Sequence, residues 1–148
     1  MTFALKITIR SAQKKDSSVI AKLSSQLGYP SVATQIQKRL RKIFSHPDTI
    51  VLVAHADQKI VGWIHLFINL RIESDTFAEI GGLVVDEKYR SHGIGKLLTQ
   101  EAEKRAKERG LKKLRVRSNV IREYAHRFYL NLGYKEEKIQ KVFWKNLR

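Results

Sequence analysis

The chain has 148 residues, 43% of them hydrophobic and 29% charged, and this length and balance predict a single globular domain over residues 1–148. The absence of cysteine excludes disulfides, thiolate metal sites and a cysteine nucleophile, and no other pattern in the chain calls for a metal. The net charge of +15 favours an anionic partner, whereas no apolar run could span a membrane and no signal peptide is evident, so we expect a cytoplasmic protein.

Apolar positions alternate in some segments, as in strands, and recur every three or four residues in others, as in helices. The first half predicts a strand at 5–10, a helix begun by Asp16 and ended by Gly28, a helix begun by Ser31 and stopped at 46–48, and a hairpin of strands 49–54 and 60–68. The second half predicts a strand at 78–85, a helix at 93–109 before Gly110, a strand at 114–117, a helix at 122–132 closed by Gly133, and one or two strands within 134–145. This order predicts an α/β fold with helices around a mixed sheet.

The junction between the strand at 78–85 and the following helix is a short basic turn that contains Gly93 and Gly95. The first turn of a helix has unpaired N–H groups, its dipole favours negative charge, and glycine lets a ligand approach the backbone. We therefore predict a phosphate or pyrophosphate site, although two glycines alone would also suit a tightly packed surface turn. Leu97 stands at the Ser/Thr position of a Walker loop and Leu98 at the third glycine of the dinucleotide fingerprint, so neither motif fits.

The excess positive charge lies in the part of the chain that contains this turn. Residues 1–86 carry 11 Lys and Arg against 7 Asp and Glu, and residues 87–148 carry 18 against 7, which gives net charges of +4 and +11. Such a field attracts nucleic acid or steers a small polyanionic ligand. Because we find no nucleic-acid-binding motif and few aromatic residues among the basic ones, we expect the small ligand.

The pattern Arg-x-x-Gly-x-Gly at residues 90–95, after a Leu-Val-Val-Asp strand, resembles the GNAT superfamily of acyl-CoA N-acyltransferases. The likeness is specific over residues 78–134, where it continues through Asn119, Ala125, Phe128-Tyr129 and Gly133-Tyr134. It implies a GNAT-like mixed sheet of six to seven strands flanked by four helices, with acetyl-CoA as co-substrate. By this resemblance acetyl-CoA is held by the backbone of Leu83, Val84 and Val85, by the loop of Arg90, Ser91, His92, Gly93, Ile94 and Gly95, and by Asn119.

Acyl transfer from a thioester to an amine requires a neutral amine, stabilisation of the oxyanion and a proton for the departing thiolate. Since no cysteine is available, we expect direct attack in a ternary complex rather than a covalent acyl-enzyme. Gly81-Gly82 lies inside a strand, which predicts either a β-bulge or close packing under an aromatic ring such as Trp63. We favour the bulge, because in the resembled family a bulge here separates two strands and admits the pantetheine arm.

The resemblance assigns two side chains to proton transfer. Tyr129 stands where the family places the tyrosine that protonates the coenzyme A thiolate, and the alternative is a core aromatic residue beside Phe128. Glu79 interrupts an apolar strand at the place of the family's glutamate base, although a glutamate that faces solvent needs no function. Asn119 would bind the cofactor, cap a helix, or do both, and His126 is more simply explained as a surface residue.

The resemblance implies an amine acceptor, and we expect a primary amine of a small molecule or peptide. Residues 78–83 and the ending after Gly133 also resemble aminoglycoside 6′-N-acetyltransferases, but these enzymes lack the tyrosine and carry acidic residues where this chain has residues 118–122. The net charge of +15 disfavours a polycation unless carboxylates gather locally. The segment 27–31, which lines the acceptor side in such enzymes, is apolar. A basic nucleic-acid-binding module, a non-catalytic coenzyme A-binding module and a homodimer remain open.

Overall fold

The computed structural model describes residues 5–26, 28 and 32–148. The chain divides into two compact units, Met1–Val116 and Arg117–Arg148. Among the described residues, every helix is too short or too polar to traverse a lipid bilayer. A single domain over the whole chain stays a prediction.

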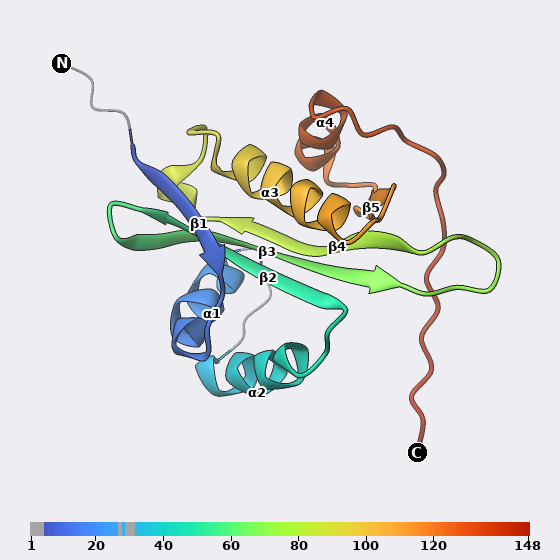
Figure 1. Ribbon diagram of the computed structural model, residues 1–148, viewed down its shortest axis with the longest axis horizontal. Helices are drawn as coiled ribbons and strands as arrows, with labels where there is room; N and C mark the ends of the chain where they lie inside the picture. The colour runs from blue at the N-terminus through green and yellow to red at the C-terminus, as the bar shows by residue number, and fades with distance from the viewer. Residues whose placement is uncertain (1–4, 27, 29–31) are drawn as a thin grey trace. The chain divides into compact units, whose positions relative to one another are not determined.

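The first unit is built on one five-stranded sheet with the order β1-β2-β3-β4-β5 (Figure 1). Its strands are β1 (Ile7–Ser11), β2 (Thr49–Ala56), β3 (Lys59–Asn69), β4 (Phe77–Val85) and β5 (Leu114–Val116). The first four strands pair antiparallel and β5 pairs parallel to β4, so the sheet is mixed, as predicted. The predicted hairpin is also present, with Asp57 and Gln58 at positive φ in its turn.

Helices cover both faces of this sheet (Figure 1). The helix pair α1 (Ser17–Ser25) and α2 (Ala33–Phe44) covers one face and α3 (Ile94–Glu108) the other, while the short 3-10 turns η1 (Lys14–Asp16) and η2 (Glu87–Tyr89) precede α1 and α3. Buried apolar side chains of α1 and α2 form one core cluster with Val51, Val53 and Val84, against which Trp63 packs. In α3, Ile94, Leu98 and Ala102 are buried at intervals of four residues, so they lie on one face of the helix, and this face packs on the sheet.

The ends of the two later helices follow their glycines as predicted. After α3, Gly110 has a φ of 80° and its N–H donates to the Lys107 carbonyl at 2.9 Å. The next N–H, of Leu111, donates to the Ala106 carbonyl at 3.1 Å, which completes a Schellman cap. The helix of the second unit, α4 (Glu123–Asn131), ends in the same manner at Gly133, with a φ of 93°.

The boundaries of the first two helices differ slightly from the prediction. The helix α1 ends at Ser25, and Gly28 follows it at a φ of 81°. The predicted start of the next helix, Ser31, lies outside the described residues, and α2 begins at Ala33.

The prediction of six to seven strands is wrong, because the described residues form five. The missing strands were expected within 134–145, and residues 135–148 have neither helix nor strand. The physical reason lies in their pattern: Val142, Phe143 and Trp144 are consecutive, whereas a half-buried strand alternates apolar and polar side chains. All three side chains are exposed.

Candidate functional site

The loop between β4 and α3 presents unused backbone amides at the start of a helix. The first intrahelical hydrogen bond of α3 runs from the Leu97 N–H to the Gly93 carbonyl at 3.0 Å, so the amides of Ile94, Gly95 and Lys96 have no helical acceptor. Gly93 has a φ of 77°, and a Cβ added there would meet no atom within 4 Å. The space in front of these amides is therefore open, and it suits an anion at the positive end of the helix dipole.

Side chains brace this loop from within. The Nδ1 atom of His92 donates to the carbonyl of Arg90 at 2.9 Å, so this imidazole holds the shape of the turn. Ahead of the loop, the buried carboxylate of Asp86 accepts from the Lys88 N–H at 3.1 Å and thereby caps η2. The Gln26 amide oxygen accepts from the Glu87 N–H at 3.0 Å, which ties the end of α1 to the same turn.

A β-bulge interrupts the pairing of β3 with β4. The register shifts between His65 and Leu66, because His65 lies opposite Gly82 whereas Leu66 lies opposite Ile80, which leaves Gly81 as the extra residue. The bulge predicted at the glycine pair is thus confirmed. The alternative, close packing of the glycine pair under an aromatic ring, holds as well, since a Cβ on Gly82 would lie 2.8 Å from the Trp63 ring.

Beyond the bulge, β4 has a partner on one edge alone. The parallel pairing with β5 ends at Ile80 opposite Val116, while β4 continues to Val85 along β3. In the described part of the first unit, no strand pairs with residues 83–85 on the edge that faces away from β3. This open edge leads directly to the amides of the α3 loop, so an extended chain that ends in a pyrophosphate could follow both.

Glu79 is buried and engaged at the junction of β4 and β5. Its Oε1 atom accepts from the Nε of Arg115 at 2.6 Å, and the two side chains form an ion pair. The Asn69 amide donates to the same oxygen at 3.5 Å. The guanidinium of Arg115 also lies 4.7 Å from the ring centroid of Phe77, a cation–π contact. The candidate base Glu79 therefore lies on the expected strand, but its carboxylate is already paired with the Arg115 guanidinium.

Tyr129 lies in the second unit on α4, half-buried between two aromatic rings. Its ring contacts Phe128 at 5.1 Å and Tyr134 at 5.6 Å between centroids, both edge to face. Tyr134 follows the helix-ending glycine, and its N–H donates to the Tyr129 carbonyl at 3.0 Å, so the helix cap also sets this ring contact. Burial raises the pKa of Tyr129 to about 12, which keeps the phenol protonated and able to donate.

Asn119 shapes the turn before α4. Its Oδ1 accepts from the Ile121 N–H at 3.2 Å, and its carbonyl accepts from the Arg122 N–H at 3.0 Å. The His126 ring donates to the same carbonyl at 2.9 Å. These bonds form a turn ahead of the helix and not a cap, because Arg122 is the N-cap of α4 and no side chain caps it. His126 supports the same turn. A cofactor contact of Asn119 stays a prediction.

A model of the acetyltransferase (GNAT) family matches residues 19–134. The chain belongs to this family. Over 91 residues it is 33% identical to the aminoalkylphosphonate N-acetyltransferase of Salmonella typhimurium, and the alignment covers 61% of this chain and 59% of that protein. The GNAT chain thus spans about three fifths of the length of this relative.

Two solved structures share the GNAT fold. A GNAT family acetyltransferase from Staphylococcus aureus has a TM-score of 0.77 at 26% identity, with 95% of this chain and 98% of that chain covered. The aminoglycoside N-acetyltransferase AAC(6')-Iy in complex with CoA has a TM-score of 0.85 at 17% identity, with 99% and 98% covered. The co-substrate of the family, acetyl-CoA, fits the features of the first unit: the β4 edge suits its extended arm, and the α3 amides suit its pyrophosphate.

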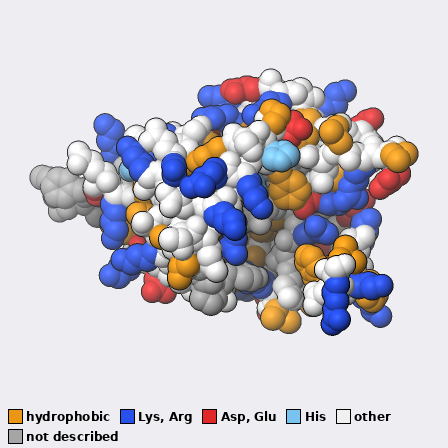
Figure 2. Space-filling view, turned by 90° about the horizontal axis from the view of Figure 1, so that it is seen from below, with side chains coloured by type: hydrophobic (Ala, Val, Ile, Leu, Met, Phe, Trp, Pro, Cys, Tyr) orange, Lys and Arg blue, Asp and Glu red, His pale blue; other side chains and the backbone are white. Residues whose placement is uncertain are grey.

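The face of the first unit formed by α1 and α2 is strongly basic (Figure 2). The exposed cations of η1, α1 and α2 are Lys14, Lys15, Lys22, Lys38, Arg39, Arg41 and Lys42. Residues 14–44 contain a single acidic residue, Asp16, which is buried and bonded to Arg10 at 2.8 Å. The segment 27–31, predicted to line the acceptor side, lies outside the described residues apart from Gly28.

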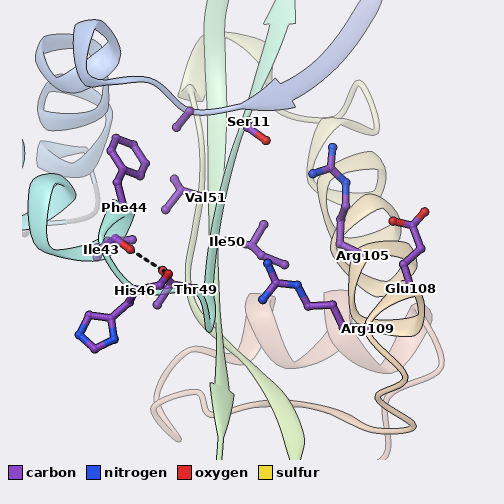
Figure 3. A pocket seen from close by; sticks show the side chains of 11 residues that line it. Ser11, Ile43, Phe44, His46, Thr49, Ile50, Val51, Arg105, Glu108 and Arg109 are labelled. Carbon is purple, nitrogen blue, oxygen red and sulfur yellow. Dashed lines mark hydrogen bonds between the residues drawn. The ribbon is translucent and has the colours of Figure 1, made fainter.

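The first unit contains two cavities, one of which reaches Gln26 and Asp86 ahead of the predicted GNAT loop. One, of about 380 Å³, is bordered by the end of α2, the start of β2 and the end of α3, where Arg105 and Arg109 extend toward it (Figure 3). The other, of about 410 Å³, lies under α1 beside Arg10 and His55. None of the predicted cofactor or catalytic residues lines either one. Within the described ranges, no group of three potential metal ligands comes together.

Two residues near the bulge escaped the sequence analysis as candidates for chemistry. The sequence pattern indicates Trp63 as a packing partner of the glycine pair alone, and it gives His65 no role. Both lie two positions apart in β3, and the apolar pattern of this strand predicts that each of its residues is part of the core. A histidine inside such a strand is the one signal that could have marked the site.

Proposed function

We propose that this GNAT protein transfers the acetyl group of acetyl-CoA to a primary amine by direct attack in a ternary complex. The observation that carries the proposal is the open edge of β4 at residues 83–85, continuous with the free amides at the start of α3. The backbone groups of Leu83, Val84 and Val85 that face this edge would pair with the pantetheine arm, and an N–H among them would polarise the thioester carbonyl. The loop from Arg90 to Gly95 would hold the pyrophosphate.

Each residue of that loop has a different part in the proposal. Gly93, Ile94 and Gly95 supply space and amides, while Arg90 supplies a positive charge at the entrance. Ser91 has a φ of 68°, so a residue other than glycine holds the left-handed conformation that turns the chain into the loop. His92 keeps this turn closed through its bond to the Arg90 carbonyl.

Tyr129 serves the departing thiolate in this proposal. A thiol has a pKa of about 8.5, so complete proton transfer from a phenol whose pKa is about 12 is uphill. The phenol instead donates a hydrogen bond to the sulfur as negative charge develops there, and the proton itself arrives from solvent. Support for this role comes from the motif around Tyr129 and from its protonated state.

The acceptor would be an amine whose remaining groups are neutral or anionic, in a small molecule or a peptide. The basic face of α1 and α2 repels a molecule with several positive charges, and it attracts one that carries a phosphonate, phosphate or carboxylate. The Salmonella typhimurium relative is named for an aminoalkylphosphonate, an amine of this kind. Neutralisation of the excess charge by nucleic acid is the competing hypothesis for this face.

Steady-state thiol release separates these acceptors. The panel contains a simple alkyl amine, 1-aminoethylphosphonate, a peptide with a free N-terminus, and kanamycin as the polycation. The proposal expects the highest kcat/KM among the first three. A kcat/KM for kanamycin far above the others would replace it with the aminoglycoside 6′-N-acetyltransferase function. A labelled-DNA or labelled-RNA shift at physiological salt, without turnover of any amine, would favour the nucleic-acid module instead.

A further inference from the structure

Two polar side-chain atoms beside the bulge are buried without a hydrogen-bond partner among the described residues. They are the Nε1 of Trp63 and the Nε2 of His65. An unpaired buried polar atom costs free energy, and such atoms concentrate where a ligand or water completes the site. Both belong to β3 at positions two residues apart, so both project from one face of the sheet.

The imidazole of His65 borders the bulge itself. Its Nδ1 atom lies 3.0 Å from the point where a Cβ on Gly81 would stand, so the missing side chain of this glycine leaves room for the ring. The ring of Phe67 lies beside the imidazole, with 5.9 Å between the centroids, and comes within 3.1 Å of the same point. Phe67 pairs with Glu79 across the strands, which puts His65 and Glu79 on the same face of the sheet.

The surroundings of His65 keep it neutral. Burial lowers its pKa from the ordinary value of 6.5, so the uncharged form dominates at neutral pH. On the same face, the carboxylate of Glu79 and the guanidinium of Arg115 compensate each other's charge. The core cluster above this face, from α1 and α2, contributes apolar side chains such as Leu23 and Leu40.

We propose that His65 is the base that takes the proton from the acceptor amine, a role that rests on the acetyl-transfer function proposed above. The open β4 edge directly follows the bulge that His65 borders, so an acetyl thioester bound along that edge would bring its carbonyl carbon toward the ring. The Glu79 carboxylate, occupied by Arg115, then acts as a positioning group for β5.

The proposed reaction is the addition of the amine to the thioester, followed by proton transfer to the imidazole. The lone pair of the neutral amine forms a bond to the thioester carbon, and the π electrons of the carbonyl move to its oxygen. The nitrogen is now cationic and strongly acidic, and its proton passes to the lone pair of His65 Nε2, the ring atom without a partner among the described residues. Collapse of the intermediate reforms the carbonyl and breaks the carbon–sulfur bond. The thiolate takes a proton from solvent, to which the imidazolium later returns its own.

The experiment compares the wild-type protein with His65→Asn and with His55→Asn as a matched control. His55 lies in β2 of the same sheet, where its Nε2 accepts from the Nε of Arg10 at 3.0 Å, and it lines no part of the bulge. The readout is kcat/KM against pH for a simple alkyl amine, with unfolding measured for all three proteins. His65→Ala is assayed in parallel with and without added imidazole.

We expect His65→Asn to lower kcat by about 100-fold or more, the usual worth of a general base, with acetyl-CoA affinity retained. For the wild type and His55→Asn, log(kcat/KM) should rise with pH at a slope of about 2 below the lowered pKa of His65, because both the base and the amine must lose a proton there. Above that pKa the slope should be about 1, because the amine alone still has to lose a proton. For His65→Asn the slope should be about 1 throughout, and imidazole should restore activity to His65→Ala.

A folded His65→Asn protein that keeps the wild-type kcat and the acid limb of the profile would overturn the inference while leaving the acetyl-transfer proposal intact. Wild-type protein that turns over no amine would overturn the acetyl-transfer proposal itself. The two failures are therefore distinguishable in one data set.

Discussion

Arg115 on β5 donates through Nε to the Oε1 of Glu79 on β4, and this partly buried ion pair lies in the last stretch where the two strands are paired. Glu79 lies opposite Arg115 in the parallel register, one residue before the pairing ends at Ile80. The carboxylate thus joins the strands immediately before the edge of β4 becomes open. This contact favours a structural role over proton abstraction for Glu79, whose base role remains the alternative.

Replacement of Glu79 tests these two roles. Glu79→Gln should lower the free energy of unfolding by about 1–3 kcal/mol, because it leaves the Arg115 charge without its partner. The pH–rate profile should keep its position, because His65 would still accept the proton. Urea unfolding and kcat/KM against pH measure the two effects. A profile displaced to higher pH in a stable Glu79→Gln protein would restore glutamate as the base.

Acetyl-CoA affinity should depend on the start of α3. Gly93→Asp places a carboxylate in the open space before the amides and should weaken binding by about 100-fold or more in calorimetry, since it repels the pyrophosphate. The matched control is Gly110→Asp, which adds the same charge at a φ of 80° at the other end of the same helix. Equal affinities in the two variants would remove the loop from the binding site.

Turnover should depend on the Tyr129 hydroxyl. Tyr129→Phe keeps both ring contacts but removes the hydroxyl that we propose donates to the sulfur, so kcat should fall about 10-fold or more with little change in acetyl-CoA affinity. Tyr124→Phe is the control, because Tyr124 lies on the same helix with 71% of its surface exposed. If both variants retain full turnover under conditions where chemistry limits the rate, Tyr129 is a packing residue.

The ion pair of Arg10 with Asp16 should make stability depend on pH. Arg10 donates through both terminal nitrogens at 2.8 Å, and these bonds hold the pKa of Asp16 below its ordinary value. The stabilisation is therefore complete above the ordinary pKa of about 3.9 and is lost as pH falls through the lowered one. Asp16→Asn should lower the free energy of unfolding by about 1–3 kcal/mol at pH 7. Solvent screening keeps this loss small, because the Arg10 side chain is partly exposed.

Urea titrations of wild type and Asp16→Asn between pH 7 and pH 3 give this difference directly. The gap in unfolding free energy should narrow as the pH drops below about 4. A gap that is constant over the whole range would show that the carboxylate's charge contributes nothing and that the loss comes from packing.

The sequence predicted the features that local rules determine. The loop was recognised because its glycines and the helix after it are adjacent in the chain, and the ends of α3 and α4 followed from Gly110 and Gly133. The bulge followed from Gly81 and Gly82, because a glycine pair weakens the interior of a strand and permits the local kink that a bulge requires.

The rest depended on pairings between distant residues. Arg115 is 36 residues from Glu79, so nothing in the neighbourhood of that glutamate revealed its cation. His65 lies inside an apolar strand, and only the register of β3 against β4 brings it to the bulge. The strands expected within 134–145 are absent, since the apolar positions of this segment do not alternate and the pattern defines no buried face.

The most direct test of direct acetyl transfer is the initial rate of thiol release with acetyl-CoA and a simple primary amine varied together. Direct attack in a ternary complex predicts no release without amine, no initial burst, and double-reciprocal lines that intersect. The acetylated amine should form in equal amount to the free thiol. Parallel lines with an amine-independent burst would contradict direct attack, and acetyl-CoA binding without release at any amine concentration would leave a protein that binds the co-substrate and does no chemistry.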